Sequence, residues 1–255
     1  MKYVRATMRL LTLCGLTGVY YLLWLVGVPF ALLLPAGLRR WRNRNFGGWA
    51  RLSARILGAH INVRNRRPAA PFLLVSNHLS YVDVVVLASQ LDCAFIAKSE
   101  VARWPILGLL CRSMNTIFVD RKRKRGLVQV VTRVASTIDG GTGVVLFAEG
   151  TSTNGEAVLP FRSSLLEFAV RQQLPVHYAS ISYAVPAGET SAAQSVCWWG
   201  DMTLPGHFFR LLQLSRFEAN LTFGEEPIIA GDRRELAAEL WSAVSSQFTD
   251  DPAGA

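Results

Sequence analysis

Acidic residues are absent from the first quarter of this 255-residue sequence. Residues 1–67 contain twelve Lys or Arg and no Asp or Glu, whereas the remainder has 15 basic and 18 acidic residues. The net charge of +9 therefore belongs to the N-terminal part. Such a charge can bind nucleic acid or an anionic membrane surface. Because these basic residues flank a long apolar segment, we expect a membrane partner and no nucleic acid.

Cysteine and histidine are scarce and dispersed. The four cysteines are scattered without a Cys-x-x-Cys pair, which argues against a disulfide framework and indicates a reducing compartment. The four histidines lie far apart, without the spacing of zinc ligands, so no metal site is predicted. A Gly-x-Ser-x-Gly nucleophile elbow is also missing, so the sequence offers no evident protein nucleophile.

One uncharged run stands out in the basic N-terminal part. Residues 10–34, LLTLCGLTGVYYLLWLVGVPFALLL, carry no charge, and roughly 20 apolar residues cross a bilayer core. The run is too long for the apolar core of a signal peptide, and no small-residue cleavage pattern follows it. Basic residues on both sides leave its orientation open.

Two modes of membrane attachment fit this run. It can be a single span, or Pro29 and Pro35 can break it into a helical hairpin that enters and leaves on one face as a re-entrant or interfacial anchor. A third reading, a buried core helix, is disfavoured because so long an uncharged stretch is unusual inside a small soluble domain.

From residue 68 onward, short apolar runs alternate with longer amphipathic ones, which is typical of an α/β domain. We predict an anchor and linker over 1–67 and a catalytic domain over 68–255. This domain should have a mixed, largely parallel central sheet flanked by helices. The predicted strands are 72–76, 94–97, 116–119, 143–147, 176–183 and 217–223. The predicted helices are 81–91, 124–138, 161–173, 204–214 and 232–248.

Polar clusters follow three of the predicted strands. They read SNHLSYVD at 76–83, VDRKRKRG at 119–126 and FAEGTSTNG at 147–155. Ligands collect beyond the carboxyl ends of strands in open α/β sheets, so we expect these clusters to form one site.

The first cluster pairs a histidine with a carboxylate. His78 precedes a predicted helix and Asp83 lies in its first turn, where an aspartate can orient an imidazole that accepts a proton. The spacing Ser80-x-x-Asp83 is also that of a capping box, so Asp83 can instead bond the exposed amide of Ser80. Because no nucleophile accompanies His78, a catalytic role implies that the activated hydroxyl belongs to a substrate.

The other two clusters supply binding groups. Glu149 directly follows a strand and needs partners if buried, Gly150 permits close backbone approach, and Thr151 offers a hydroxyl. Arg121 lies nearest the end of its strand, where a guanidinium suits a phosphate or carboxylate. The rest of the run RKRKR is typical of a solvated helix face or of contact with anionic lipid.

Together the clusters resemble the glycerolipid acyltransferase family that includes 1-acylglycerol-3-phosphate acyltransferases. NHLSYVD, which begins at Asn77, is similar to that family's Asn-His-x-x-x-x-Asp motif, and FAEGTSTNG to its Phe-Pro-Glu-Gly-Thr motif. KSEVARWPILG with NTIFVDR resembles the second block, and LPVHYASISY the fourth. The resemblance covers about residues 70–185.

The resemblance implies a reaction and roles for the residues. His78 removes the proton from a lysolipid hydroxyl as it attacks an acyl thioester, and Asp83 orients His78. The co-substrate is acyl-coenzyme A or acyl-acyl carrier protein, with no bound cofactor and no metal. The enzyme acts on the cytoplasmic side of the inner membrane. The implied acceptor-binding residues are Asn77, Arg121, Glu149, Gly150, Thr151, Arg162 and Pro175.

Three positions depart from the family pattern. Ala148 replaces the proline of the third motif, and Asn115 stands where glycine is common. Ser152 follows Glu-Gly-Thr where phosphatidate-forming members typically have an arginine that helps to hold the acceptor phosphate. The missing arginine favours similarity to members that acylate lyso-ornithine lipid, although Arg162 can replace the charge and keeps a lysophosphatidic acid acceptor open.

Two further questions remain at this stage. Trp198, Trp199, Phe208 and Phe209 can line an acyl tunnel, face lipid or pack in the core. A membrane-bound, non-catalytic protein that binds lipid or nucleic acid through its basic N-terminus is the competing function.

Overall fold

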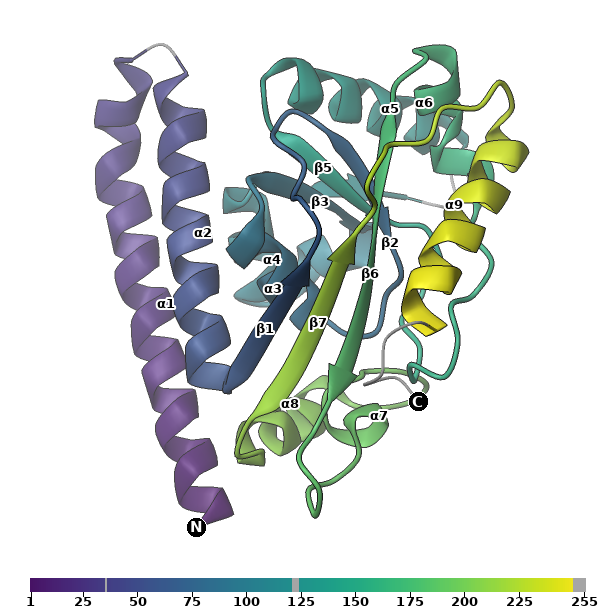
Figure 1. The fold of residues 1–255 in the computed structure, drawn as a ribbon. Helices are drawn as coiled ribbons and strands as arrows, with labels where there is room; N and C mark the ends of the chain where they lie inside the picture. The colour runs from purple at the N-terminus through teal and green to yellow at the C-terminus, as the bar shows by residue number, and fades with distance from the viewer. Residues whose placement is uncertain (35, 121–123, 250–255) are drawn as a thin grey trace.

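The computed structural model describes residues 1–34, 36–120 and 124–249, which form one seven-stranded sheet with helices around it (Figure 1). The order of strands is β1-β7-β6-β2-β5-β3-β4. Neighbouring strands run parallel except β6 and β7, which are antiparallel. The predicted α/β class with a mixed, largely parallel sheet is thus confirmed. The strands are β1 (Ala59–Arg64), β2 (Leu73–Ser76), β3 (Cys93–Lys98), β4 (Ile117–Val119), β5 (Gly143–Phe147), β6 (Val176–Ala184) and β7 (Phe217–Phe223).

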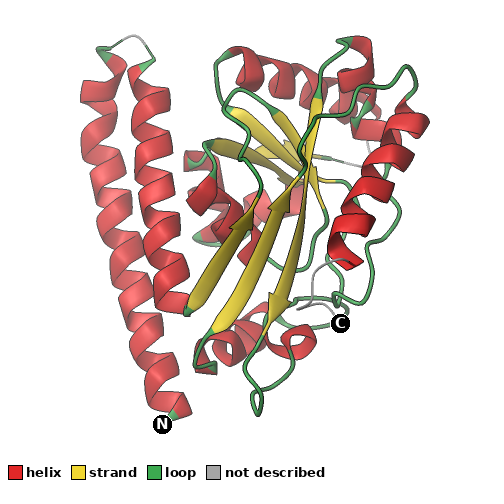
Figure 2. Cartoon of the chain, in the orientation of Figure 1, coloured by secondary structure: helices red, strands yellow, loops and turns green. Residues whose placement is uncertain are grey.

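The central strands are the most apolar part of the sheet. Every residue of β2 and β5 is buried, as the continuous runs LLVS and GVVLF predict for strands covered on both faces. In Figure 2, α9 lies in front of the sheet and α3 behind it. The helices of the α/β part are α3 (Val82–Gln90), α4 (Leu107–Ser113), α5 (Lys124–Asp139), α6 (Glu167–Arg171), α7 (Ala192–Ser195), α8 (Leu204–Gln213) and α9 (Arg233–Thr249), with short 3-10 turns η1 (Ser99–Arg103) and η2 (Ser163–Leu165).

Two long helices form an antiparallel hairpin along one side of the sheet (Figure 1). The first, α1 (Lys2–Leu32), is a single helix that contains the uncharged run and keeps Pro29 inside it. The second, α2 (Gly37–Leu57), carries six arginines and no acidic residue in its first turn. The hairpin reading required a break of the uncharged run at Pro29, but the helix continues through this residue. The chain reverses only after the run, and Pro35 lies outside the described residues.

The hairpin is attached to the sheet domain at both of its ends. Near the start of α1, the Arg9 guanidinium donates to the carbonyl oxygens of Leu214 (2.6 Å) and Ser215 (3.0 Å). Near the tip of the hairpin, Arg39 donates to the carbonyl of Gly141 (3.0 Å). The hairpin consequently lies along the domain instead of projecting away from it.

The strand β1 differs from the predicted organisation. It falls inside the range 1–67 assigned to an anchor and linker, but it pairs in parallel with β7 over Ala59–Arg64. Its exposed and half-buried residues alternate, as expected of an edge strand with one face toward the core. The sheet domain thus begins before residue 68, and α2 leads directly into it.

Candidate active site

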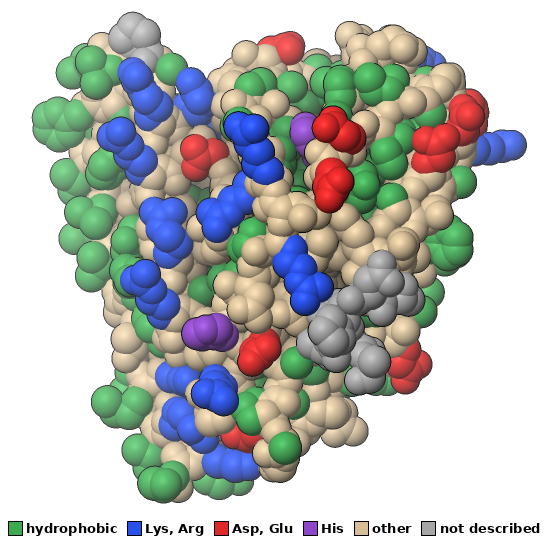
Figure 3. Space-filling view, in the orientation of Figure 1, with side chains coloured by type: hydrophobic (Ala, Val, Ile, Leu, Met, Phe, Trp, Pro, Cys, Tyr) green, Lys and Arg blue, Asp and Glu red, His purple; other side chains and the backbone are tan. Residues whose placement is uncertain are grey.

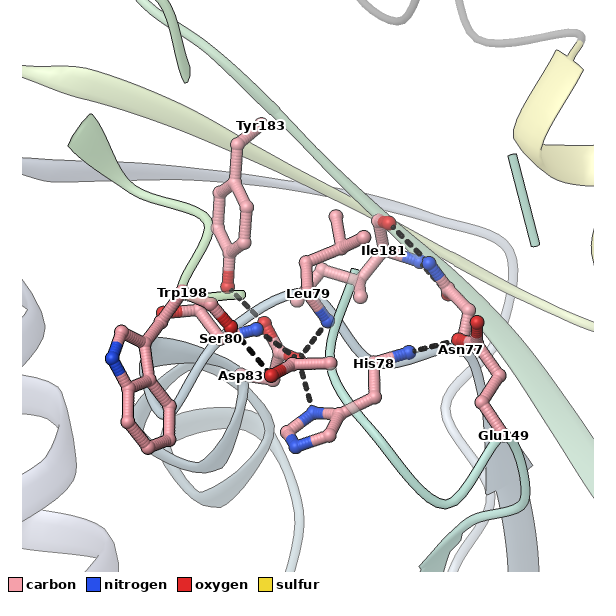
Figure 4. Close-up of polar contacts among 10 residues, drawn as sticks. Asn77, His78, Leu79, Ser80, Asp83, Glu149, Ile181, Tyr183 and Trp198 are labelled. Carbon is pink, nitrogen blue, oxygen red and sulfur yellow. Dashed lines mark hydrogen bonds and ion pairs between the residues drawn. The ribbon is translucent and has the colours of Figure 1, made fainter. Parts of the chain in front are cut away.

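The polar site begins at the carboxyl end of β2, where His78 meets Asp83. The Nδ1 atom of His78 lies 2.7 Å from Oδ2 of Asp83 (Figure 4). The chain leaves β2 at Ser76 and enters α3 at Val82, so a short turn brings the aspartate in the first turn of the helix back toward the imidazole. At this distance the two side chains form a direct hydrogen bond, which is the contact that the catalytic reading of their spacing predicts.

Asp83 is completely buried and accepts four hydrogen bonds. Its Oδ2 accepts from the amides of Leu79 (2.8 Å) and Ser80 (3.0 Å) as well as from His78, and its Oδ1 accepts from the Tyr183 hydroxyl (2.7 Å). As a carboxylate, Asp83 offers only acceptor oxygens. Its bond to His78 therefore requires the proton on Nδ1, which leaves Nε2 as the acceptor nitrogen.

The hydrogen bond from the backbone amide of Ser80 to Asp83 is the contact that the capping-box reading predicts. The capping and catalytic readings are therefore compatible. The reciprocal half of the box is missing: Tyr81 is the N-cap of α3, and no side chain caps it. Asp83 thus starts the helix and orients the histidine with the same carboxylate.

An aromatic wall fixes the imidazole ring. The rings of His78 and Phe147 stack with centroids 4.1 Å apart and an angle of 18° between their planes. The side chain of His78 remains 23% exposed, and Nε2 is on the side of the ring away from Asp83 (Figure 4). The accessible nitrogen is thus the unprotonated one, which is the arrangement a general base requires.

Glu149 holds the backbone on which His78 sits. Its side chain is buried, Oε1 accepts from the amide of His78 (2.6 Å), and Oε2 accepts from the amide of Leu159 (2.9 Å). Burial raises the pKa of this carboxyl to about 7, an effect that these two backbone donors and the nearby imidazole partly offset. The described contacts of Glu149 are with the chain itself, so the structure places it as a support of His78 at the site.

Asn77 is also turned inward. Its side-chain nitrogen donates to the carbonyl of Ile181 (2.9 Å), and its side-chain oxygen accepts from the amide of the same residue (2.8 Å). The amide group thus continues the pairing of β2 with β6 past the last strand residue. Asn77 is fully buried, so its described contacts join two strands beneath His78.

The loop after β5 lies against the same turn. Gly150 has a positive φ of 78°, which glycine adopts without strain, and Thr151 is exposed beside it. The hydroxyl of Ser152 donates to the carbonyl of Trp198, and the amide of Thr153 donates to the carbonyl of His78 (3.0 Å). The Glu-Gly-Thr segment and the His78 turn therefore form one connected unit, as the predicted meeting of strand ends requires.

Three predicted binding residues are not brought to His78 by described contacts. Arg121 lies outside the described residues. The side chain of Arg162 is exposed, and only its amide is tied to the loop, through the carbonyl of Ala148 (2.9 Å). Pro175 precedes β6, where Val176 pairs with Leu73 at the start of β2, so it lies at the sheet edge opposite His78. Pro175 shapes the beginning of β6 and does not border the site.

Of the four aromatic residues between 198 and 209, some pack near the His78 turn and others lie away from it. Trp198 is half-buried, and the centroid of its ring lies 6.0 Å from that of Tyr81 and 6.5 Å from that of Trp104. Its amide donates to the carbonyl of Leu79 (2.8 Å). Phe208 also contacts Tyr81, at 6.1 Å. Phe209 instead stacks on Tyr3 of α1 at 6.4 Å, and Trp199 is 39% exposed.

Two residues at the site escaped the sequence reading. Tyr183, which donates to Asp83, is buried, and burial together with the aspartate charge raises its pKa well above the usual range, so it stays protonated. Phe147 provides the wall under His78. Both stand in apolar strands, where alternation predicts core packing, and their polar or stacking partners are distant in sequence.

Comparisons with known proteins extend this picture. A family model described as Acyltransferase matches residues 60–182. Two proteins named lyso-ornithine lipid O-acyltransferase are each 33% identical to the chain. The one from Brucella abortus (strain 2308) aligns over 85% of this chain and 86% of its own length, and the one from Rhizobium meliloti (strain 1021) over 93% and 85%.

Proteins with a second name are similar as well. A 1-acyl-sn-glycerol-3-phosphate acyltransferase from Neisseria gonorrhoeae is 25% identical over 95% of this chain and 94% of its own length. The crystal structure of the 1-acyl-sn-glycerophosphate acyltransferase of Thermotoga maritima superposes with a TM-score of 0.71 over 98% of this chain and 97% of that one. At 19% identity this likeness shows a shared fold.

Proposed function

The chain belongs to the acyltransferase family, and from this premise we propose that it moves a fatty acyl group from acyl-coenzyme A or acyl-acyl carrier protein to a lysolipid hydroxyl, with His78 as general base. Its place among lysolipid acyltransferases of lipid biosynthesis rests on the relatives. The catalytic assignment is supported by one observation, the 2.7 Å contact between Nδ1 of His78 and Oδ2 of Asp83, from which we infer a proton on Nδ1 and an acceptor Nε2.

The reaction forms one bond and breaks another at the carbonyl carbon of the thioester, and His78 moves the proton between them. The acceptor hydroxyl gives its proton to Nε2 of His78 as its oxygen bonds to that carbon. The carbon–sulfur bond then breaks, and the departing thiolate takes the proton from the imidazolium. Asp83 stabilises the imidazolium between these events, because its buried charge lies 2.7 Å from Nδ1. General-base catalysis of this kind contributes about 10²–10⁴-fold to rate.

For the acceptor, we propose lyso-ornithine lipid as the first choice and lysophosphatidic acid as the second. The first is supported by the relatives at 33% identity and by Ser152, whose hydroxyl is engaged with Trp198 where an arginine would offer charge to a phosphate. The second is supported by the relatives with the other name and by the exposed side chain of Arg162.

We further propose that the protein is held in one leaflet of the cytoplasmic membrane, with the catalytic part on the cytoplasmic side. The helix α1 is long and apolar enough to cross a membrane, and only 6% of its most apolar stretch is buried in the protein. The attachment of both hairpin ends to the sheet domain favours an interfacial anchor over a span. Exposed arginines of α2 gather beside the apolar side chains of α1 (Figure 3), where they meet anionic headgroups.

A thioester-release assay with purified full-length protein tests the mechanism and the acceptor together. Lyso-ornithine lipid and lysophosphatidic acid are supplied side by side, with each acyl donor. We expect His78→Ala to lower turnover by about 10²–10⁴-fold. His60→Ala is the matched control, since His60 is exposed on β1, and it should leave turnover unchanged.

The outcomes separate the two parts of the proposal. Wild-type turnover by a folded His78→Ala variant would disprove the general-base role. Faster acylation of lysophosphatidic acid would reverse the acceptor preference but keep the mechanism. Thioester release from neither donor on either acceptor, with tight salt-sensitive binding to DNA, would support the non-catalytic alternative.

A further inference from the structure

At the start of α4 the chain turns a set of large apolar side chains toward solvent. Ile106 is 74% exposed, Leu107 40% and Leu109 50%. We call residues 104–109, WPILGL, the apolar turn. Single exposed apolar residues are common on soluble proteins, but a contiguous group of them marks a surface for an apolar partner.

The backbone of the apolar turn is held in a conformation that costs free energy. Ile106 has a φ of 62°, a region that a β-branched residue rarely adopts. The amide of Leu107 closes the turn on the carbonyl of Pro105 at 2.6 Å. With its ψ of −58°, this is the rare and strained form of γ-turn, a conformation that glycine adopts more easily. Isoleucine at this position is thus disfavoured by both its backbone and its exposure, unless its side chain has an apolar partner.

The apolar turn adjoins the active site. The ring of Trp104 contacts that of Trp198 at 6.5 Å, and the amide of Trp198 bonds the carbonyl of Leu79, the residue after His78. The turn also follows β3, whose carboxyl end lies at the same sheet edge as that of β2, because both strands run parallel to β5.

The apolar turn adjoins the membrane-facing hairpin as well. Leu110, Ser113 and Met114 at the end of α4 line one groove together with residues of both long helices. The hairpin residues that line it are Thr17, Tyr20, Tyr21, Trp24, Arg42, Asn45, Phe46 and Trp49. In Figure 1, α4 lies beside the hairpin, so the apolar turn at the start of α4 is close to both long helices.

The charges around the apolar turn match an anionic surface. Lys98, Arg103 and Arg112 are exposed on or next to η1 and α4, and Glu100 is the one acidic residue from 98 to 113. Apolar side chains ringed by basic ones are typical of segments that enter the interface of a bilayer with anionic lipids.

We propose that the apolar turn is a second membrane-insertion point, which dips into the bilayer at the mouth of the active site and joins that mouth to the lipid. The inference rests on the proposed membrane-bound function and adds a location to it. The hairpin holds the protein on the membrane, and the apolar turn positions the site against it. A lysolipid can then pass from the leaflet to His78 beside Trp104 and Trp198 without crossing water.

An environment-sensitive fluorophore tests the insertion without any need for catalysis. The dye is attached at Ile106→Cys in the full-length protein, in a background that carries Cys14→Ser and Cys111→Ser because these two cysteines are the accessible ones. Mixed phosphatidylglycerol and phosphatidylcholine vesicles are then added. We expect the emission of the dye to shift to shorter wavelength and to be quenched by brominated lipid.

The matched control is the same dye at Ile229→Cys. Ile229 is 53% exposed, and it lies next to Ile228, which bridges to Val176 at the sheet edge opposite the site. We expect no shift there. An unshifted dye at position 106 on vesicles that bind the protein would overturn the proposal. A shift that follows protein concentration or added acyl carrier protein without vesicles would assign the apolar turn to a second copy or to the donor protein.

Catalysis supplies a second readout. The double variant Ile106→Gly, Leu109→Gln places a residue that tolerates the positive φ at position 106 and removes the apolar surface. We expect turnover on vesicle-embedded lysolipid to fall about tenfold, with turnover on a short-chain, monomeric lysolipid unchanged. Ile229→Asn should affect neither. An equal loss of turnover on both acceptors would indicate damage to the site and refute a membrane role of the apolar turn. Wild-type protein that is active on neither acceptor would refute the proposed function instead.

Discussion

At the residue scale, the four hydrogen bonds to Asp83 set the chemistry of the site. Three of them come from the turn that Asp83 itself organises, and the fourth comes from Tyr183 on β6. Because all four donors already hold the carboxylate, the proposed mechanism needs little rearrangement when the imidazole gains charge. In the proposed mechanism the aspartate orients the imidazole and does not act as a second proton acceptor.

Tyr183→Phe tests the contribution of the fourth donor. Loss of the hydroxyl removes the described donor to Oδ1 of the buried Asp83, and a hydrogen bond to a charged group is worth about 1.5–3 kcal/mol. We expect kcat to fall roughly tenfold with little change in KM, measured by thioester release.

Tyr178→Phe is the matched control for this variant, because Tyr178 lies half-buried on the same strand and its ring faces Gly224 instead of Asp83. It should keep wild-type kcat. Equal losses in the two variants, or a loss confined to thermal stability, would assign Tyr183 a purely structural role.

The residues that sequence reading could find at the site are those with local partners. His78 and Asp83 are five positions apart, and a single turn brings them together. Tyr183 is 100 positions from Asp83, and Glu149 is 71 from the amide that it supports. These contacts depend on the order of strands in the sheet, which local patterns do not determine.

At the scale of elements, one departure from the family pattern has a backbone explanation. Asn115, which stands where glycine is common, has a φ of 61° at the end of α4. Asparagine is one of the few residues besides glycine that adopts this region readily. The substitution therefore keeps the turn between α4 and β4.

We accordingly expect Asn115→Gly to leave the free energy of unfolding nearly unchanged and Asn115→Ala to lower it by about 1 kcal/mol. Thermal unfolding in detergent compares the two variants, and each serves as the control for the other. A stable alanine variant would show that the positive φ is not what selects asparagine at this position.

Other elements show where sequence patterns reach their limit. Six predicted strands correspond to β2–β7 with shifts of about one residue at their ends, because each is a short apolar run between turn residues. The helix α2 and the strand β1 were missed. The arginines of α2 obscure its buried stripe of Phe46, Ala50, Ala54 and Leu57, and β1 is half-exposed with its pairing partner β7 more than 150 residues away.

At the scale of the whole molecule, α1 serves two purposes on two faces. Its inner face contributes Ala6 and Leu13 to the hydrophobic core, and its outer face exposes Leu22, Leu25 and Val26. An anchor that is simply appended would contribute nothing to the core. The predicted division at residue 67 thus does not separate two independent parts.

The two faces can be tested separately. Changing Leu22, Leu25 and Val26 to glutamine should release much of the protein from sedimented membranes without lowering Tm, because these side chains are 52–61% exposed. Deleting residues 1–36 should also release the protein from membranes, but this deletion should lower Tm because it removes core residues and uncovers α2. Each large side chain that loses its burial should lower the free energy of unfolding by about 1.5–3 kcal/mol. A deletion variant as stable as the full chain would contradict a structural role for α1.

The attachment of the hairpin at both ends also bears on how the enzyme meets its acceptor. With the hairpin lying in one leaflet, as we propose, the site stays at a constant height above that leaflet, since Arg9 and Arg39 tie the hairpin to the sheet domain. The search for the acceptor then takes place in two dimensions. Its velocity follows the mole fraction of lysolipid among the surrounding lipids, and adding inert lipid slows the enzyme even when the amount of acceptor per volume of solution is unchanged.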